Sequence, residues 1–231
     1  PCGTLFPYTT LFRSGAFCSG WPKGKSAFVL MSFNNAMNDM YTLAHELGHA
    51  VHDHYLYRSQ TLLNTNLSMC VAETASIFGE LLLTDLLLEK MDDESKKQQI
   101  LAHVLDEAGM AIFQVSSRFW FEKSMYEMIE KGKNLDGETI AELWTNARDD
   151  VYGDAVEWFE EMRWEWTMKP HYYIPNFRFY NYPYVYAQLF VYSLYKLYKQ
   201  DKKAFIPKFK ELLKTGSSIS ASDAGKIMGL E

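Results

Sequence analysis

The pattern of apolar and polar residues changes near position 34 of the sequence. Residues 27–33 read AFVLMSF, a short apolar run rich in β-forming side chains, and residues 17–21 have a similar character. Residues 22–25, PKGK, which lie between these runs, are typical of a turn. The pattern therefore predicts two strands that pair through this turn. After them, apolar residues recur with the spacing of a helix.

Helices are predicted for most of the remaining chain. The first begins at Asn35 or Asn38, either of which can cap a helix, and it runs to about Tyr57. A turn at 133–137 and an irregular aromatic segment around 170–175 separate the later helices. These are expected at 67–91, 92–131, 139–168, 184–200 and 203–214, with one more short helix at the end of the chain. We find no repeat and no linker, so a single, mainly α domain is expected.

The helix that ends near Tyr57 has two contrasting faces. At about 100° per residue, its apolar residues form one stripe, made of Met40, Leu43, Leu47, Ala50 and Val51. A second stripe, roughly 180° away, carries His45, His49 and His52. We expect the apolar stripe to pack on a core and the imidazoles to face a cleft.

Residues 45–49 read HELGH and match the HExxH pattern. Random sequence of this composition would contain roughly 0.01 such matches, so composition alone does not explain it. Two histidines at i and i+4 are neighbours on a helix, and both rings can reach one zinc ion. Glu46 is rotated away from the line of His45 and His49, which suits a base that acts on zinc-bound water. The alternative is a surface helix with two solvated histidines.

A catalytic zinc site needs a third protein ligand and an open coordination position. Glu73 and Glu80 lie on nearly the same face of the next predicted helix, which is otherwise apolar. Burying a carboxylate there is costly unless it is paired or bound to metal, so Glu73 is the predicted ligand. Its alternative role is that of a solvated or salt-bridged acid. Glu80 is expected to hydrogen-bond a ligating histidine, and His52 to do the same or to pack in the core. Direct ligation of the metal is the less favoured alternative for both residues.

Composition limits the possible partners. The 23 Lys and Arg residues and 29 Asp and Glu residues give a net charge of −6, which argues against nucleic-acid binding. The longest apolar stretch, around 81–88, is interrupted by Thr84 and Asp85 and falls short of the roughly 20 residues of a membrane span. The cysteines are odd in number and widely spaced. They predict free thiols and a cytoplasmic location: Cys2, Cys18 and Cys70.

We interpret the first 14 residues as different in origin from the remainder of the sequence. Residues 6–14 read FPYTTLFRS, which matches the translation of a common sequencing-adapter oligonucleotide. We therefore interpret residues 1–14 as an artefactual leader and residues 15–231 as the folded part. The alternative is an ordinary loop rich in threonine and aromatic residues.

Several segments together resemble a known family. They read RSGAFC at 13–18, FVL at 28–30, TLAHELGHAVH at 42–52, VAETAS at 71–76, HYYIP at 171–175 and FYNYPY at 179–184. In this combination the sequence resembles the oligoendopeptidase F branch of the thimet oligopeptidase-like zinc metallopeptidases. HExxH by itself would indicate only a zincin-type protease.

The resemblance implies a zincin-like helical catalytic domain, with a small β-sheet beside the HExxH helix, that forms one wall of a deep peptide channel. It implies one catalytic zinc ion, bound by His45, His49 and Glu73. It also implies that further residues line the channel and stabilise the transition state, namely His171, Tyr180 and Tyr184. Tyr182 is a less close match, and core packing is the alternative role for these tyrosines. The family's N-terminal region, which forms the opposite wall, is an expected partner of this chain.

The expected function is that of a zinc metalloendopeptidase that hydrolyses short oligopeptides, with Glu46 as general base. Two alternatives remain. One is a catalytically inactive zinc-binding fragment or scaffold. The other is a di-iron carboxylate protein, which would need two Glu-x-x-His motifs, whereas only Glu46-x-x-His49 is present.

Overall fold

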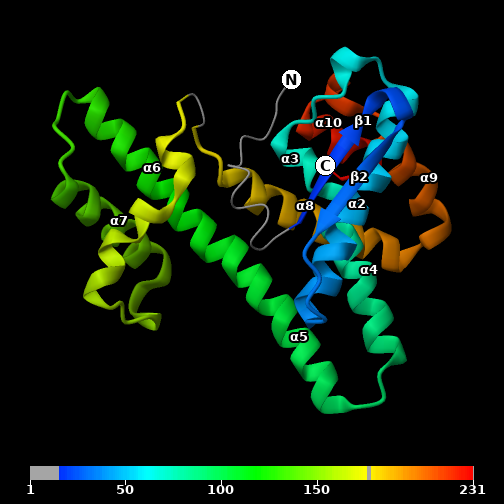
Figure 1. Ribbon diagram of the computed structural model, residues 1–231, viewed down its shortest axis with the longest axis horizontal. Coiled ribbons are helices and arrows are strands. Elements are labelled where there is room, and N and C mark those ends of the chain that lie inside the picture. The colour runs from blue at the N-terminus through cyan, green and yellow to red at the C-terminus, as the bar shows by residue number, and fades with distance from the viewer. Residues whose placement is uncertain (1–15, 176–177, 231) are drawn as a thin grey trace. The chain divides into compact units, whose positions relative to one another are not determined.

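The computed structural model describes residues 16–175 and 178–230, and the leader predicted at 1–14 lies outside these ranges. Helices predominate in the described residues, and one two-stranded sheet accompanies them, as the sequence predicted (Figure 1). None of the helices in the described ranges is both long enough and apolar enough to cross a membrane.

The chain forms two compact units. Of the described residues, unit 1 combines those up to Ile100 with those from Ala187 onward, and unit 2 contains those within Leu101–Tyr186. Both crossings fall inside helices, α5 (Glu94–Gly109) and α8 (Tyr182–Gln200). Because no linker marks either crossing, composition gave no sign of this division.

The sheet of unit 1 is the predicted hairpin. Strand β1 (Ala16–Trp21) pairs antiparallel with β2 (Ser26–Met31), with Cys18 opposite Val29. Lys25 closes the turn in the left-handed region at φ 51°, and its N–H donates to the carbonyl of Pro22. Of the apolar side chains on the hairpin, Trp21, Phe28 and Leu30 are about half exposed.

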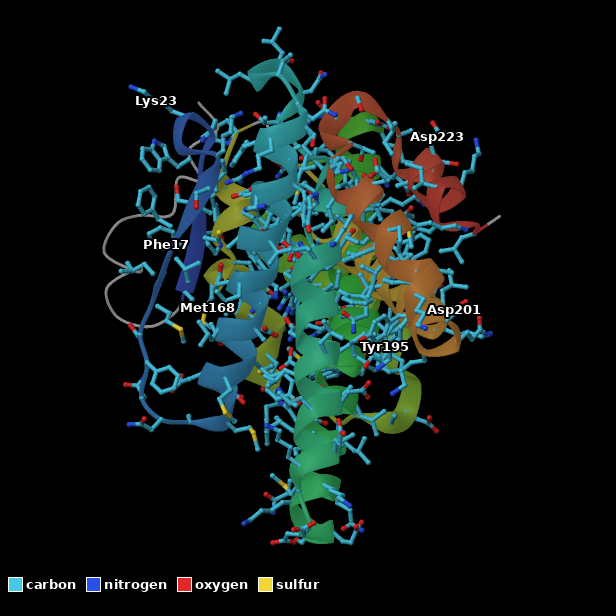
Figure 2. All side chains as sticks on the ribbon, turned by 90° about the vertical axis from the view of Figure 1, so that its right-hand side faces the viewer. Phe17, Lys23, Met168, Tyr195, Asp201 and Asp223 are labelled. Atoms are coloured by element: carbon cyan, nitrogen blue, oxygen red, sulfur yellow. The ribbon has the colours of Figure 1, made fainter. Side chains whose placement is uncertain are left out.

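Helix α2 (Met37–Ser59) lies between the hairpin and α4 (Thr74–Lys90), and α9 (Lys202–Leu213) and α10 (Ala221–Met228) lie beyond them. Figure 2 shows this order from Phe17 and Lys23 on one side to Asp201 and Asp223 on the other. On α4, the buried Phe78 packs with four aromatic rings at centroid distances of 4.7–5.6 Å, those of Tyr195, Tyr198, Phe205 and Phe209. This aromatic cluster joins α4 to α8 and α9.

The orientation that the sequence predicted for α2 is wrong. Its buried residues are Tyr41, Glu46, Gly48, His52 and Leu56, which surround the histidine side of the helix. Leu47 and Val51 of the apolar stripe are each 49% exposed, and Met40 is 36% exposed. The histidine face packs on α4 because Gly48 has no side chain: a Cβ there would lie 2.3 Å from the carbonyl oxygen of Ala75.

Unit 2 is built on α6 (Val115–Glu130) and α7 (Gly137–Tyr152). Its core contains Phe121, Trp144 and Ala147, and the rings of Phe121 and Trp144 meet edge to face at 5.0 Å. The buried Trp144 also donates its indole N–H to the carbonyl of Met162 at 3.1 Å. This bond attaches the segment after α7 to the helix pair.

Three predicted helices are interrupted, the one at 67–91 by a break at Glu73, and one cap differs. The 92–131 helix is divided by a π-helical turn at Met110–Gln114, and the 139–168 helix ends at Tyr152. Gly153 follows at φ 58°, and Glu160–Met168 forms a 3-10 helix. At the start of α2 the cap residue is Ala36, since the Asp39 carboxylate takes the backbone N–H groups of Asn34 and Ala36 at 2.6 and 2.9 Å. Apolar periodicity does not register such local hydrogen bonds.

We expect Gly48→Ala to lower the free energy of unfolding by about 3 kcal/mol, the upper part of the range for overpacking. The added methyl group would meet backbone atoms of Ala75 and Ser76, which cannot move without shifting α4. Urea denaturation followed by circular dichroism measures the change. Gly109→Ala is the matched control, because the nearest atom to its Cβ is 4.0 Å away. A Gly48→Ala variant as stable as this control would contradict the packing described.

Candidate metal centre

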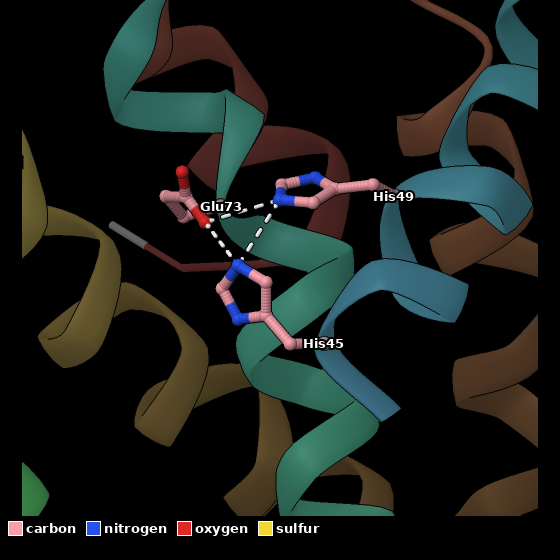
Figure 3. Close-up of side chains that lie close together, drawn as sticks. All are labelled: His45, His49 and Glu73. Atoms are coloured by element: carbon pink, nitrogen blue, oxygen red, sulfur yellow. Dashed lines mark hydrogen bonds and ion pairs between the residues drawn. The ribbon is translucent and has the colours of Figure 1, made fainter. Parts of the chain in front are cut away.

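Three side chains that the sequence singled out converge in unit 1, as Figure 3 shows. The Nε2 atoms of His45 and His49, both on α2, lie 3.1 Å apart. Oε2 of Glu73 lies 3.3 Å from the first and 3.5 Å from the second. Within residues 16–175 and 178–230, these three form the one group of His, Cys, Asp or Glu residues that could hold a metal ion.

The separations of these three atoms fit a zinc ion. With zinc–ligand bonds of about 2.0–2.1 Å, tetrahedral geometry places neighbouring ligand atoms about 3.3–3.4 Å apart. The measured separations of 3.1, 3.3 and 3.5 Å lie around that value. Two imidazoles and one carboxylate form a donor set used by catalytic zinc, and it leaves a fourth position for water or substrate.

Glu73 reaches the two histidines through a break in the helix that the sequence predicted at 67–91. The chain forms α3 (Met69–Ala72), leaves helical geometry at Glu73, and starts α4 at Thr74. The buried hydroxyl of Ser76 donates to the Glu73 carboxylate at 2.8 Å, and it also lies 3.0 Å from the Glu73 carbonyl oxygen. Ser76 therefore helps to fix both the backbone and the carboxylate of this residue.

Glu80 has the relation to the ligands that the sequence predicted. Its Oε1 lies 2.5 Å from Nδ1 of His45, which donates this hydrogen bond. A histidine must be neutral to bind a metal, so with this proton on Nδ1 it is Nε2, the atom close to His49 and Glu73, that would give up its proton to an ion. A carboxylate in this position orients the ring and makes it a stronger ligand.

The charges in this cluster favour a cation. Burial opposes the charged form of His45, but hydrogen bonds to Glu73 and Glu80 outweigh it and raise its pKa to about 10. Burial would raise the pKa of Glu73, but His45, His49 and Ser76 together lower it to about 2. The pKa of His49 is lowered, chiefly by burial. The site thus stabilises positive charge beside an ionised carboxylate, as a site for a divalent metal must.

Glu46 is outside the ligand group and is only 7% exposed. Burial raises its pKa, and the charge of His45 and a hydrogen bond from the Cys18 backbone partly offset this effect. The hydrogen bond connects Glu46 to strand β1. A buried carboxylate with a raised pKa is a stronger base than an exposed one, which suits proton transfer near neutral pH.

His52 is a core residue. It is 1% exposed, and neither ring nitrogen has a hydrogen-bond partner among the described residues. Burial and the nearby His49 lower its pKa to about 4, so the ring is neutral at pH 7. Of the roles that the sequence left open for His52, core packing is the one that the geometry supports.

The late aromatic residues gather within unit 2. The hydroxyl oxygens of Tyr180 and Tyr184 lie 2.6 Å apart, and the rings of His171 and Tyr180 lie 5.7 Å apart. Asn181, which is 3% exposed, donates its amide N–H to Nε2 of His171 at 2.9 Å. Burial, with the charges of Arg118 and Lys169, lowers the pKa of His171 to about 4.

Sequence reasoning missed two residues that hold these groups in place, Ser76 and Asn181. Each follows a singled-out residue within a few positions, but neither is of a type that identifies a site by itself. Tyr182, the less close match, is 48% exposed, and its ring lies 6.4 Å from that of Phe119. The free thiols expected at Cys18 and Cys70 are present, and burial raises the Cys18 pKa to about 12.

Comparison with known proteins gives consistent matches. The model of peptidase family M3 matches residues 12–231. Oligopeptidase PepF of Bacillus subtilis is 30% identical over 95% of this chain, and an oligoendopeptidase F homolog of Borreliella burgdorferi is 32% identical over 95%. The chain spans 32% and 37% of these relatives, about a third of their length. The crystal structure of oligoendopeptidase-F from Enterococcus faecium matches with a TM-score of 0.68 and 28% identity, over 84% of this chain and 34% of that one.

Proposed function

Because this chain belongs to peptidase family M3, we propose that it is the catalytic part of a zinc metalloendopeptidase that hydrolyses short oligopeptides. The observation that carries the proposal is the convergence of His45, His49 and Glu73 at separations that fit zinc. The names of the relatives, oligopeptidase and oligoendopeptidase F, support the substrate class.

The residues of the chain have distinct roles in this proposal. His45, His49 and Glu73 hold the zinc ion, and Glu80 orients His45 through Nδ1. When bound by these residues, zinc would supply Lewis-acid chemistry, because it would lower the pKa of a bound water toward about 7 and polarise the scissile carbonyl. The Glu46 carboxylate accepts the proton of the attacking water and delivers it to the leaving amine.

His171, Tyr180 and Tyr184 are proposed to donate hydrogen bonds to the oxyanion that develops during attack. The 2.6 Å separation of the two tyrosine hydroxyl oxygens supports this role, because it brings two groups that can each donate a hydrogen bond to one place. The bond that Asn181 makes to Nε2 leaves the proton of the neutral His171 ring on Nδ1. Each donor of this kind can contribute about 10²–10³-fold to turnover.

Removal of the tyrosine hydroxyls tests this assignment. Tyr184→Phe is expected to lower kcat for a quenched fluorogenic peptide by about 10²-fold with little change in KM, because the lost bond forms only in the transition state. Tyr180→Phe should have a similar effect on kcat. Tyr192→Phe, which removes a hydroxyl from the same helix as Tyr184, is the control. Equal kcat values for the Tyr184 and Tyr192 variants would remove Tyr184 from the mechanism.

Chelation tests the function as a whole. We expect about one zinc ion per chain by elemental analysis, loss of peptide cleavage on treatment with a chelator, and recovery when zinc is returned. The assay is run on this chain and on a form extended to the length of its relatives, because the remaining polypeptide is proposed to act with this part. Bound zinc without chelator-sensitive cleavage in either form would favour the inactive fragment or scaffold.

The proposed setting is the cytoplasm, which the absence of a disulfide between Cys18 and Cys70 supports. Peptides are the proposed partners, and a net charge of −6 supports the exclusion of nucleic acid.

A further inference from the structure

Glu122 is a buried carboxylate that the proposed mechanism does not use. It lies in the middle of α6 and is 3% exposed. Its Oε1 accepts the backbone N–H of Phe179 at 2.7 Å, across 57 residues of sequence. Its Oε2 is buried and has no hydrogen-bond partner among the described residues. A carboxylate is costly to bury for a single hydrogen bond, so this bond requires an explanation.

The residue that Glu122 holds has an unusual backbone. Phe179 has φ 52°, in the left-handed region that glycine favours and that a bulky aromatic residue rarely adopts. Such a conformation persists only when the surrounding structure enforces it, and it is commonest at functional sites. Burial raises the pKa of Glu122, whereas the bond from the Phe179 N–H and the charge of Arg178 favour its ionised form, in which the bond is charge-assisted and stronger than one between neutral groups.

The same face of α6 also holds the ring of Phe179. The centroids of Phe119 and Tyr126 lie 5.4 and 5.5 Å from that of Phe179. Positions 119, 122 and 126 are spaced i, i+3 and i+7, so they share one face of the helix. α6 therefore contacts Phe179 at two points: Glu122 binds its backbone amide, and two aromatic residues pack on its ring.

The next residue along the chain is Tyr180. Its hydroxyl contacts that of Tyr184, and the following Asn181 bonds to His171. A cavity of about 280 Å³ is lined by both Glu122 and His171, so the contact between Glu122 and Phe179 lies close to His171. The direction in which the chain leaves Phe179 sets where the Tyr180 side chain begins.

We propose that Glu122 is a positioning residue, which holds the Phe179 amide so that Tyr180, and through it Tyr184, keeps the orientation used in catalysis. The proposal rests on the proposed role of the two tyrosines. Glu122 acts through the backbone of Phe179 and has no role in proton transfer.

Two substitutions separate this role from simple packing. Glu122→Leu fills a similar volume but cannot accept the Phe179 N–H, whereas Glu122→Gln keeps an acceptor oxygen. We expect Glu122→Leu to speed hydrogen exchange of the Phe179 amide, measured by NMR, by about tenfold. We expect it to lower kcat by about 10–100-fold with zinc content unchanged, as a small misplacement near the reacting atoms does. Glu122→Gln should restore slow exchange and most of kcat.

Glu127→Leu is the matched control, because Glu127 lies on the same helix and pairs only with Lys123 among the ion pairs of the described residues. It should change neither the exchange nor kcat. The proposal would be overturned if the Phe179 amide of Glu122→Leu exchanged at the wild-type rate. It would also be overturned if this amide exchanged faster but kcat stayed unchanged, provided that Tyr184→Phe does lower kcat. Hydrogen exchange is measured without turnover, so it tests the contact between Glu122 and Phe179 independently of catalysis. If Tyr184→Phe leaves kcat unchanged, the proposed role of the tyrosines is refuted, and the exchange result for Phe179 still stands.

Discussion

Replacing Glu46 with glutamine is expected to reduce peptide cleavage by about 10²–10⁴-fold while zinc remains bound. Glutamine has nearly the same shape as glutamate and can still accept the hydrogen bond from the Cys18 backbone. It cannot accept the proton of the attacking water. Because Glu46 is outside the group formed by His45, His49 and Glu73, the metal should be retained at the same stoichiometry.

The measurement is kcat for a quenched fluorogenic peptide together with the zinc content of the same sample. Glu89→Gln, an exposed position on α4, is the control for loss of one carboxylate. Circular dichroism shows whether the buried site tolerates the change. If Glu46→Gln binds zinc and cleaves at the rate of the control, Glu46 is not the base, and a different proton acceptor must be sought near the metal.

The second large effect is expected for Glu73→Ala, which should lose zinc at concentrations that saturate the parent chain. One of three protein ligands is removed, and the alanine side chain cannot replace it. The affinity should fall by more than the roughly 10–100-fold typical for loss of a partner that orients a ligand. Glu80→Gln removes such a partner from His45, so its zinc affinity should lie between those of the parent and of Glu73→Ala.

Zinc titration with a competing chelator measures this order. Glu73→Gln serves as a second variant, because it keeps an oxygen that can accept the Ser76 hydroxyl and so preserves the start of α4. Weak zinc binding in both Glu73 variants, with the helix content unchanged by circular dichroism, identifies Glu73 as a ligand. Unchanged stoichiometry in Glu73→Ala would move the assignment to Glu80 or His52.

The sequence determined the local features of this protein. HELGH within a helical pattern places His45 and His49 on one face, because i and i+4 are neighbours in any α-helix. The hairpin followed equally from β-forming residues on either side of a turn. The pairing of Glu80 with His45 was also predictable, since an acid on an apolar helix needs a partner.

The tertiary structure decided which side of each helix is buried and where helices break. Periodicity assigned the apolar stripe of α2 to the core, yet Leu47 and Val51 are half exposed. Ligand atoms from α2 and from Glu73, at the start of α4, can converge only between these two helices, so the polar histidine face had to be buried, and Gly48 permits the close approach. The break in the helix at Glu73 and the hydrogen bond between Glu122 and Phe179 likewise depend on atoms from positions that are far apart in the sequence. The spacing of residues along the sequence describes only one or two turns of a helix at a time. It does not encode contacts between residues that are far apart in the sequence.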